Sequence, residues 1–381
     1  MKKILSILLS ISLIVVGSSV VAAQAEEANS PFDKMPISVI SNDSLATISA
    51  SEYINSTNVS DKITLVEKSN YTDDLLNKLK ADFENSKIIV FYNNNNDLLD
   101  PLYALNTLGY GNGMAVSYED DDARENANHI IASAAYIDEN NNIHSMAYFD
   151  LSNTDSSIRT KVLNIAETYL DYDDRVGERY STNIVAPLEQ TMASNPYDDY
   201  TNVIKEFTFD WGKYGKMQST SCFSRVGYTS SQSVWDLYGA NFFQVKSPYG
   251  AQEVFTRYSV EDIANERVVD HGPTTISSGG TATVGLDTGG PSISWWQDLS
   301  GIYLNDYYNP PDYARWKFTY TIAQSDKNMT FNPGARFTNT SGQFLCDVSH
   351  SYRCIKAGFL GIGREDKTLS TGTYRYYMND R

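Results

Sequence analysis

Residues 281–296 read TATVGLDTGGPSISWW, and this stretch decides the fold of the second half of the chain. Both of its ends alternate between apolar and polar residues, and the DTGGP between them is rich in residues that favour turns. The pattern predicts an antiparallel β-hairpin with strands over 281–286 and 292–296. The motif Asp287-Thr-Gly within this turn is also typical of the catalytic loops of aspartic proteases. That chemistry needs two such loops and this sequence has one, so a turn is the favoured interpretation.

Residues 206–381 around this hairpin contain further short runs rich in Thr, Val, Ile and aromatic residues, separated by Gly, Pro, Asn and Ser. Such runs with turn signals between them are typical of an antiparallel sandwich or an open barrel. The predicted strands are 207–211, 224–228, 241–245, 254–258, 281–286, 292–296, 316–322 and 373–378. We therefore expect an all-β, antiparallel, sandwich-like domain over residues 206–381.

The pattern differs in residues 61–180, where strands and helices alternate. Residues 63–67 and 87–92 predict strands, and between them Thr72 is a helix N-cap followed by two acidic residues. The apolar face of that helix is Leu75, Leu76, Leu79 and Phe83. Residues 130–137 and 143–149 predict a hairpin, and 156–172 predict a second helix. We expect an α/β or α+β domain, so the whole chain is predicted to be multidomain.

The distribution of charged residues also divides the chain near residue 205. Residues 26–205 carry 12 bases and 30 acids, whereas residues 206–381 carry 16 bases and 17 acids. The start of the chain has two lysines, an apolar run and Ala23-Gln24-Ala25, which together are typical of a secretory signal. The predicted organisation is a signal peptide at 1–25, a polar leader at 26–60, an acidic domain at 61–180, a linker at 181–205 and a β domain at 206–381.

This organisation indicates a secreted, extracellular protein and limits its partners. A formal charge of −17 repels nucleic acid, which proteins bind by neutralising phosphates with Lys and Arg. The motifs G-x-S-x-G, H-E-x-x-H and C-x-x-C do not occur in the sequence, so common hydrolase and zinc signatures are missing. We expect no catalytic residue and no metal ligand, and a hydrolase is kept as a third, less favoured class.

Cys346 and Cys354 enclose seven residues, and in an exported protein a disulfide between them is the first prediction. Cys222 then has no partner within this pairing. It is a free thiol, forms a disulfide with another chain, or replaces one of the two cysteines in the pair. No cofactor is predicted. The acidic runs 119–122, 171–174 and 198–199 lack EF-hand spacing, so calcium is only an alternative to a solvated acidic surface.

The stretch 274–320 has a Ser/Thr/Gly-rich alternating strand, a glycine turn, a second strand and then Ala314-Arg-Trp-Lys-Phe318. In this order it resembles the stem and following strands of secreted β-channel cytolysins of the leukocidin and haemolysin type. The resemblance implies a protein that forms a homo-oligomer on a target membrane, to which each copy donates a hairpin. The membrane-facing candidates in this hairpin are Ile276, Val284, Leu286, Ile293, Trp295 and Trp296.

Two departures from that family leave another function open. The sequence after Phe318 is short for the regions that follow the stem in such toxins, and the acidic half has no counterpart in them. The alternative is a secreted binding or adhesion module that recognises a glycan or a protein through aromatic side chains. The candidates for such a platform are Trp235, Trp295, Trp296, Trp316, Tyr303, Tyr307, Tyr308 and Tyr313.

Overall fold

A computed structural model describes residues 38–40, 63–68, 71–93, 98–138, 142–152, 202–228, 231–274, 281–288, 293–298, 301–325, 328–356 and 363–379. These residues belong to one compact unit. Several predictions lie outside them, namely the signal peptide, most of the leader, the helix at 156–172, nearly all of the linker and Ile276. In the described part, no helix has the length and apolar character needed to cross a bilayer.

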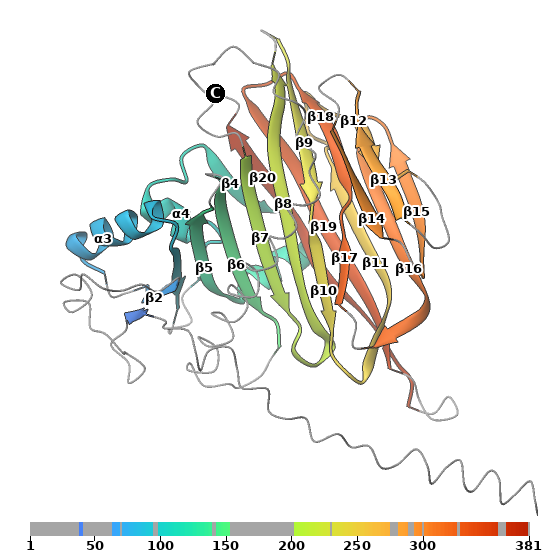
Figure 1. Cartoon of the computed structure of the whole chain (residues 1–381), viewed down its shortest axis with the longest axis horizontal. Coiled ribbons are helices and arrows are strands. Elements are labelled where there is room, and N and C mark those ends of the chain that lie inside the picture. The colour runs from blue at the N-terminus through green and yellow to red at the C-terminus, as the bar shows by residue number, and fades with distance from the viewer. Residues whose placement is uncertain are drawn as a thin grey trace, which may run out of the picture. The chain divides into compact units, whose positions relative to one another are not determined.

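Two large β-sheets make up most of the described residues (Figure 1). The larger sheet has the order β1-β2-β3-β5-β6-β7-β8-β9-β18-β12, and β10 pairs with both β8 and β17. Its strands are β1 (Ser38–Ile40), β2 (Ile63–Glu67), β3 (Ile88–Tyr92), β5 (Ile130–Ile137), β6 (Ile143–Asp150), β7 (Asn202–Asp210), β8 (Gly215–Tyr228), β9 (Ser233–Gly239), β10 (Asn241–Val245), β12 (Glu266–Gly272), β17 (Asn328–Phe331) and β18 (Gly334–Asn339).

The smaller sheet has the order β15-β16-β11-β19-β20-β4. Its strands are β4 (Met114–Tyr118), β11 (Tyr249–Ser259), β15 (Ile302–Asn309), β16 (Tyr313–Ser325), β19 (Gln343–Lys356) and β20 (Glu365–Asn379). A separate two-stranded sheet consists of β13 (Thr281–Leu286) and β14 (Ile293–Asp298). The helical elements are α3 (Asp73–Glu84), α4 (Tyr103–Leu108), α5 (Asp121–Ala127) and the 3-10 turn η2 (Gly212–Tyr214).

The βαβ unit predicted near the start of the acidic half is confirmed. The Thr72 hydroxyl accepts the backbone N–H of Leu75 at 3.3 Å and caps α3, and two aspartates follow in the first turn. Leu75, Leu79 and Phe83 of α3 are buried, while β2 and β3 pair in parallel. The hairpin of β5 and β6 is also present, so local periodicity was sufficient to find these elements.

Separate acidic and β domains are not confirmed. Strand β6 from the acidic half pairs directly with β7 from the aromatic half, with His144 opposite Ile204. Strand β4 likewise pairs with β20 in the other sheet. Because backbone hydrogen bonds join the two halves in both sheets, the contrast in charge does not coincide with a structural boundary.

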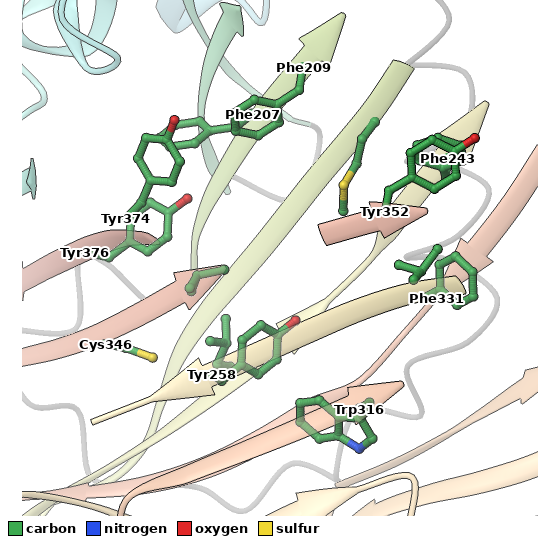
Figure 2. Close-up of a cluster of buried hydrophobic side chains, with 14 of the residues drawn as sticks. Phe207, Phe209, Phe243, Tyr258, Trp316, Phe331, Cys346, Tyr352, Tyr374 and Tyr376 are labelled. Carbon is green, nitrogen blue, oxygen red and sulfur yellow. The ribbon is translucent and has the colours of Figure 1, made fainter. Parts of the chain in front are cut away.

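The main core lies between the two large sheets, and Figure 2 shows side chains from both of them meeting there. Phe207 from β7 contacts the ring of Tyr374 from β20, with ring centroids 5.2 Å apart. Phe243 from β10 and Tyr352 from β19 are closer, at 3.7 Å. Burial of each large apolar side chain contributes about 1.5–3 kcal/mol, so this aromatic layer is a major source of stability.

Sequence patterns found eight strands of the aromatic half and missed the others. The predicted runs 241–245 and 281–286 coincide with β10 and β13. Strands β9, β12, β15, β17, β18 and β19 were not predicted. Several of these carry buried polar or charged side chains at alternate positions, such as Asp236 in β9 and Arg336 in β18, so they contain no continuous apolar run.

Candidate functional site

The hairpin of β13 and β14 is the candidate site, and its backbone register follows the sequence prediction. Val284 lies opposite Trp295, and Leu286 lies opposite Ile293. Since alternate residues of a strand share a face, these four residues belong to the same face of the hairpin. Trp296 lies opposite Thr283 and therefore belongs to the other face. The structure thus brings together five of the six predicted membrane-facing residues in one hairpin, four of them on one face.

Leu286 attaches this hairpin to the larger sheet. It is 1% exposed and packs in a small apolar cluster, separate from the main core. Its partners in the cluster are Ile204, Cys222, Tyr238 and Ala240. In β8 and β9 the adjacent residues Phe223 and Leu237 point into the main core instead. The cluster therefore lies on the outer face of the larger sheet, the face turned away from the core.

The carboxylate of Asp270 holds the end of β13. Its Oδ2 accepts the backbone N–H groups of Asp287 at 2.7 Å and Thr288 at 3.0 Å. Its Oδ1 accepts the N–H of His271 at 2.8 Å. Burial raises the pKa of this carboxyl group, but the N–H groups of Thr288, Asp287 and His271 outweigh burial and keep its pKa below the ordinary value. Asp270 is therefore a charged clasp on the hairpin.

A row of charged side chains crosses the outer face of the sheet beside this clasp. In β18, Arg336 donates from Nε to Oδ1 of Asp236 at 2.6 Å and from Nη2 to Oδ2 at 2.9 Å. Arg336 is also the register partner of Asp270 in β12. The hairpin strand β13 contacts both β12 and β18. The hairpin therefore lies against a surface whose main groups are charged, with Leu286 as its buried apolar anchor.

Sequence reasoning missed Asp270, Asp236 and Arg336. The DTG segment was interpreted as a turn, and the N–H groups of Asp287 and Thr288 now have a defined partner in Asp270. No local motif marks that partner, because Asp270 is 17 positions away and lies in a strand that the apolar pattern did not indicate. Contacts of this kind depend on the pairing of β12 with β18, which is not encoded locally.

The predicted disulfide between Cys346 and Cys354 is wrong. Both cysteines are free and buried in the main core. They lie in the same strand, β19, eight positions apart, which separates them by about 26 Å at the rise of a β-strand. A disulfide needs Cα atoms within about 7 Å. Burial raises the pKa of the Cys346 thiol, so this cysteine is an apolar core residue.

The acidic run 119–122 has structural roles in the described residues. The Asp120 carboxylate accepts the N–H of Ala123 at 2.8 Å and caps α5, with Asp121 and Asp122 in the first turn. Glu119 lies 3.3 Å from Arg375. In the described ranges no three His, Cys, Asp or Glu side chains are grouped as metal ligands. The other two acidic runs, at 171–174 and 198–199, lie outside these ranges.

Of the eight aromatic candidates for a binding platform, two are buried, two are exposed, and Tyr308 and Tyr313 are partly buried, while the side chains of Trp295 and Trp296 lie outside the described part. Trp235 and Trp316 are buried, and Trp316 donates its indole N–H to the carbonyl of Pro273 at 3.1 Å. Tyr303 and Tyr307, both on β15, are 45% and 46% exposed. The described aromatic surface is therefore formed by tyrosines of the smaller sheet, while these tryptophans belong to the core.

No family model and no curated protein matches the sequence. Two solved structures can be aligned with part of this chain. One solved structure is described as a pore forming protein, with a TM-score of 0.27, 9% identity, and coverage of 46% of this chain and 88% of that chain. Another is Clostridium perfringens delta-toxin, with a TM-score of 0.32, 9% identity, and coverage of 47% and 89%. The predicted partial resemblance to such toxins is confirmed, and at these TM-scores no function is transferred from them.

Proposed function

We propose that this is a secreted, non-enzymatic protein that acts on a target membrane by inserting the hairpin of β13 and β14. One observation carries the proposal: the hairpin is a separate two-stranded sheet that Leu286 and the Asp270 clasp hold on the outer face of the larger sheet. A hairpin attached in this way can leave without breaking the ladder of either large sheet. The homo-oligomer on the membrane remains part of the same proposal.

The chemistry of the two surfaces supports release of the hairpin. Its departure uncovers Leu286, which costs about 1.5–3 kcal/mol, and the charged row of Asp236, Arg336 and Asp270, which water solvates readily. The face with Val284, Leu286, Ile293 and Trp295 then becomes available to lipid. A membrane strand needs about 9–11 residues, and the predicted alternation continues at Ile276 on the N-terminal side.

The test is a reversible tether between the hairpin and the sheet below it. Ala240 and Leu286 belong to the same cluster, so Ala240→Cys and Leu286→Cys are combined in a Cys222→Ala background that removes the nearby thiol. Leakage of a dye from phosphatidylcholine vesicles, with and without cholesterol, and from vesicles of total cell lipid is measured. The oxidised variant should release no dye, and reduction should restore release.

The matched control is Leu286→Cys in the same Cys222→Ala background, which has no second cysteine in this cluster and should leak under both conditions. Mass spectrometry of the oxidised protein confirms that the tether has formed. The proposal fails if the tethered protein permeabilises vesicles as fast as the reduced protein. It also fails if the wild-type chain permeabilises none of the vesicles.

A second candidate function is recognition of an extracellular glycan or protein without insertion. The observation in its favour is the exposure of Tyr303 and Tyr307 on one face of β15. The guanidinium of Arg315 lies 5.5 Å from the ring centre of Tyr307, which adds a cation to this aromatic surface. Binding that Tyr303→Ala and Tyr307→Ala abolish, in a protein that never causes leakage, would favour this function.

A further inference from the structure

A polar pocket of about 260 Å³ lies on the outer face of the smaller sheet, where β11, β19 and β20 run side by side. The residues between its floor positions, such as Tyr258, Val348 and Tyr374, point into the main core. The floor therefore consists of alternate residues that face away from the core. It has two rows of register partners: Arg257, Ser349 and Thr373, and beside them Ser259, Asp347 and Arg375.

One end of the pocket is a fixed arrangement of ion pairs. Arg375 donates from Nε to Oδ1 of Asp347 at 2.7 Å and from Nη2 to Oδ2 at 2.9 Å. The Nη1 atom of the same side chain lies 3.3 Å from Oε2 of Glu119. A guanidinium held by carboxylates on two sides has little freedom to rotate, so the donors and acceptors at this end are already in place before a ligand arrives.

The other end has unused hydrogen-bonding capacity. The guanidinium of Arg257 stacks over the ring of Tyr313 at 4.5 Å and its Nη2 donates to Glu261. Its Nε is buried and has no hydrogen-bond partner among the described residues. Because this N–H is buried away from solvent, the free capacity at this end comes from the hydroxyl groups of the floor. Ser349 and Thr373 add hydroxyl groups that can both donate and accept.

The lining excludes several ligand classes. Two arginines and four acids give the pocket a formal charge of −2, which disfavours phosphate, sulfate and acidic sugars. Both arginines already pair with carboxylates. The lining has no apolar side chain to hold an acyl chain, and the described residues contain no group of three metal-binding side chains. Among uncharged ligands, one with several closely spaced hydroxyl groups fits the donors and acceptors of this lining.

We propose that this pocket binds one pyranose ring of a neutral sugar. Adjacent ring hydroxyls can donate to Asp347 and Glu119 and exchange hydrogen bonds with Ser349 and Thr373, which matches the mixed donors and acceptors of the lining. The volume is just below the range of about 300–1,000 Å³ typical of drug-sized ligands, so it suits a single ring. The site is independent of the hairpin and of membrane insertion.

Ligand-observed NMR and calorimetry on the full chain test the ligand class. The probes are methyl glycosides of glucose, galactose, mannose and N-acetylglucosamine, together with glucuronate, N-acetylneuraminate and choline. At least one neutral glycoside should bind with a dissociation constant on the order of 1 mM, as expected for one small ligand, and the two acidic sugars should not bind. Binding of choline alone, or of the acidic sugars alone, would overturn the proposal, as would binding of none of the probes.

Variants locate the site. Ser349→Ala combined with Thr373→Val removes two hydroxyls from the floor without breaking an ion pair and should weaken the best glycoside at least about tenfold. Ser351→Ala, two positions further along β19 and outside the pocket, is the matched control and should bind as the wild type does. Thermal unfolding checks that each variant is folded. Unchanged binding in the double variant would place the sugar elsewhere and contradict the proposal.

The source of the sugar is resolved with vesicles. Phosphatidylcholine vesicles with and without a glycolipid that carries the best sugar are mixed with the protein, and bound protein is separated by flotation. Binding that needs the glycolipid, and that the free methyl glycoside competes away, supports recognition of a lipid headgroup by this pocket. Binding of the free glycoside without flotation supports a soluble or protein-linked glycan at the same pocket. If the free glycoside does not bind and does not reduce flotation, the result contradicts sugar binding by this pocket.

Discussion

His144 illustrates how the properties of one residue depend on both local and distant neighbours. Its Nδ1 lies 2.6 Å from Glu206 Oε1 and its Nε2 lies 3.1 Å from Asp138 Oδ2, with its ring stacked on Tyr136. Burial lowers the pKa of His144, but the charge of Glu206 and the hydrogen bonds to Asp138 and Glu206 raise it to about 9. Asp138 lies six positions before His144 in the β5–β6 hairpin, whereas Glu206, 62 positions away, becomes a partner through the pairing of β6 with β7.

We expect His144 to make folding sensitive to alkaline pH. Because the folded pKa lies above the ordinary value of 6.5, its contribution is complete below pH 6.5 and is lost as the pH rises through about 9. The contribution is on the order of 3 kcal/mol. Urea unfolding at pH 7 and at pH 9.5 should show a larger loss of unfolding free energy in the wild type than in His144→Gln.

The wild type is compared with His144→Gln because a second buried group, Lys205, also changes the pH dependence of stability. Burial lowers its pKa to about 7, so its effect on stability has the opposite sign and rises with pH above that value. The difference between wild type and His144→Gln cancels this contribution. Equal pH dependence in the two proteins would show that His144 is not the group that titrates.

At Asp270 the expected effect is local. Asp270→Asn removes the charge that accepts the N–H groups of Asp287 and Thr288, and hydrogen bonds to a charged group are worth about 1.5–3 kcal/mol. Amide exchange at these two positions should accelerate at least about tenfold. The pKa of Asp270 is lower in the folded than in the unfolded chain. The stabilisation by this carboxylate is therefore complete above its pKa in the unfolded chain and is lost as the pH falls through its pKa in the folded chain.

Asp262→Asn is the matched control for the clasp. Asp262 is an exposed aspartate in the turn after β11, and its positive φ of 63° suits asparagine as well as aspartate. Exchange at residues 287 and 288 should be unchanged in this variant. If it accelerates as much as in Asp270→Asn, net charge and not the hydrogen bonds controls the end of β13.

At the scale of elements, β19 explains the error about the cysteines. Phe344, Cys346, Val348, His350, Tyr352 and Cys354 are the alternate, core-facing residues of one continuous strand. That period of two is present in the sequence, but His350 and the intervening polar residues obscure it, so the sequence alone does not show that both cysteines belong to one strand. His350 is accommodated as a neutral ring between Ser219 and Thr256, which only the packing of the two sheets provides.

Strand β20 requires a glycine at position 372. Its φ is +73°, and a Cβ at this position would lie 2.2 Å from the backbone N and 2.5 Å from the Cα of Ala123 in α5. Both backbone strain and the clash disfavour alanine. We expect Gly372→Ala to reduce the free energy of unfolding by on the order of 3 kcal/mol, measured by urea denaturation.

Gly363→Ala separates these two causes. Gly363 has a similar φ of +77°, but a Cβ there would meet nothing within 4 Å. This variant should report the backbone strain alone and lose less stability. If both variants lose the same amount, contact between β20 and α5 does not constrain Gly372.

At the scale of the whole molecule, the local elements of the acidic half were predictable and the strand pairing that joins the two halves was not. Charge and composition changed near residue 205, but backbone hydrogen bonds take no account of side-chain charge, and β6 pairs with β7 across that point. The candidate hairpin was predicted because its alternation and its turn are local. Its clasp and the charged row beneath it required the pairing of strands that are distant in sequence.

The shared sheets predict a single unfolding transition. All five tryptophans lie in the aromatic half and report on that half, while hydrogen exchange in 88–92 and 130–137 reports on the acidic half. In urea, the tryptophan fluorescence and these amides should follow the same midpoint. Two separate midpoints would show that the acidic half is an independent domain after all.

The pairing of β4 with β20 determines when the molecule can complete its fold. The hydroxyls of Ser117 and Tyr377 lie 3.1 Å apart although these residues are 260 positions apart in sequence. A ribosome makes β4 early and β20 late, so the smaller sheet stays open at β4 until the final strand has been synthesised. Pairing over such a separation makes folding slow, and during that time β4 and β19 present unpaired strand edges. A chaperone that covers strand edges would therefore act in the interval before β20 pairs with β19 and β4.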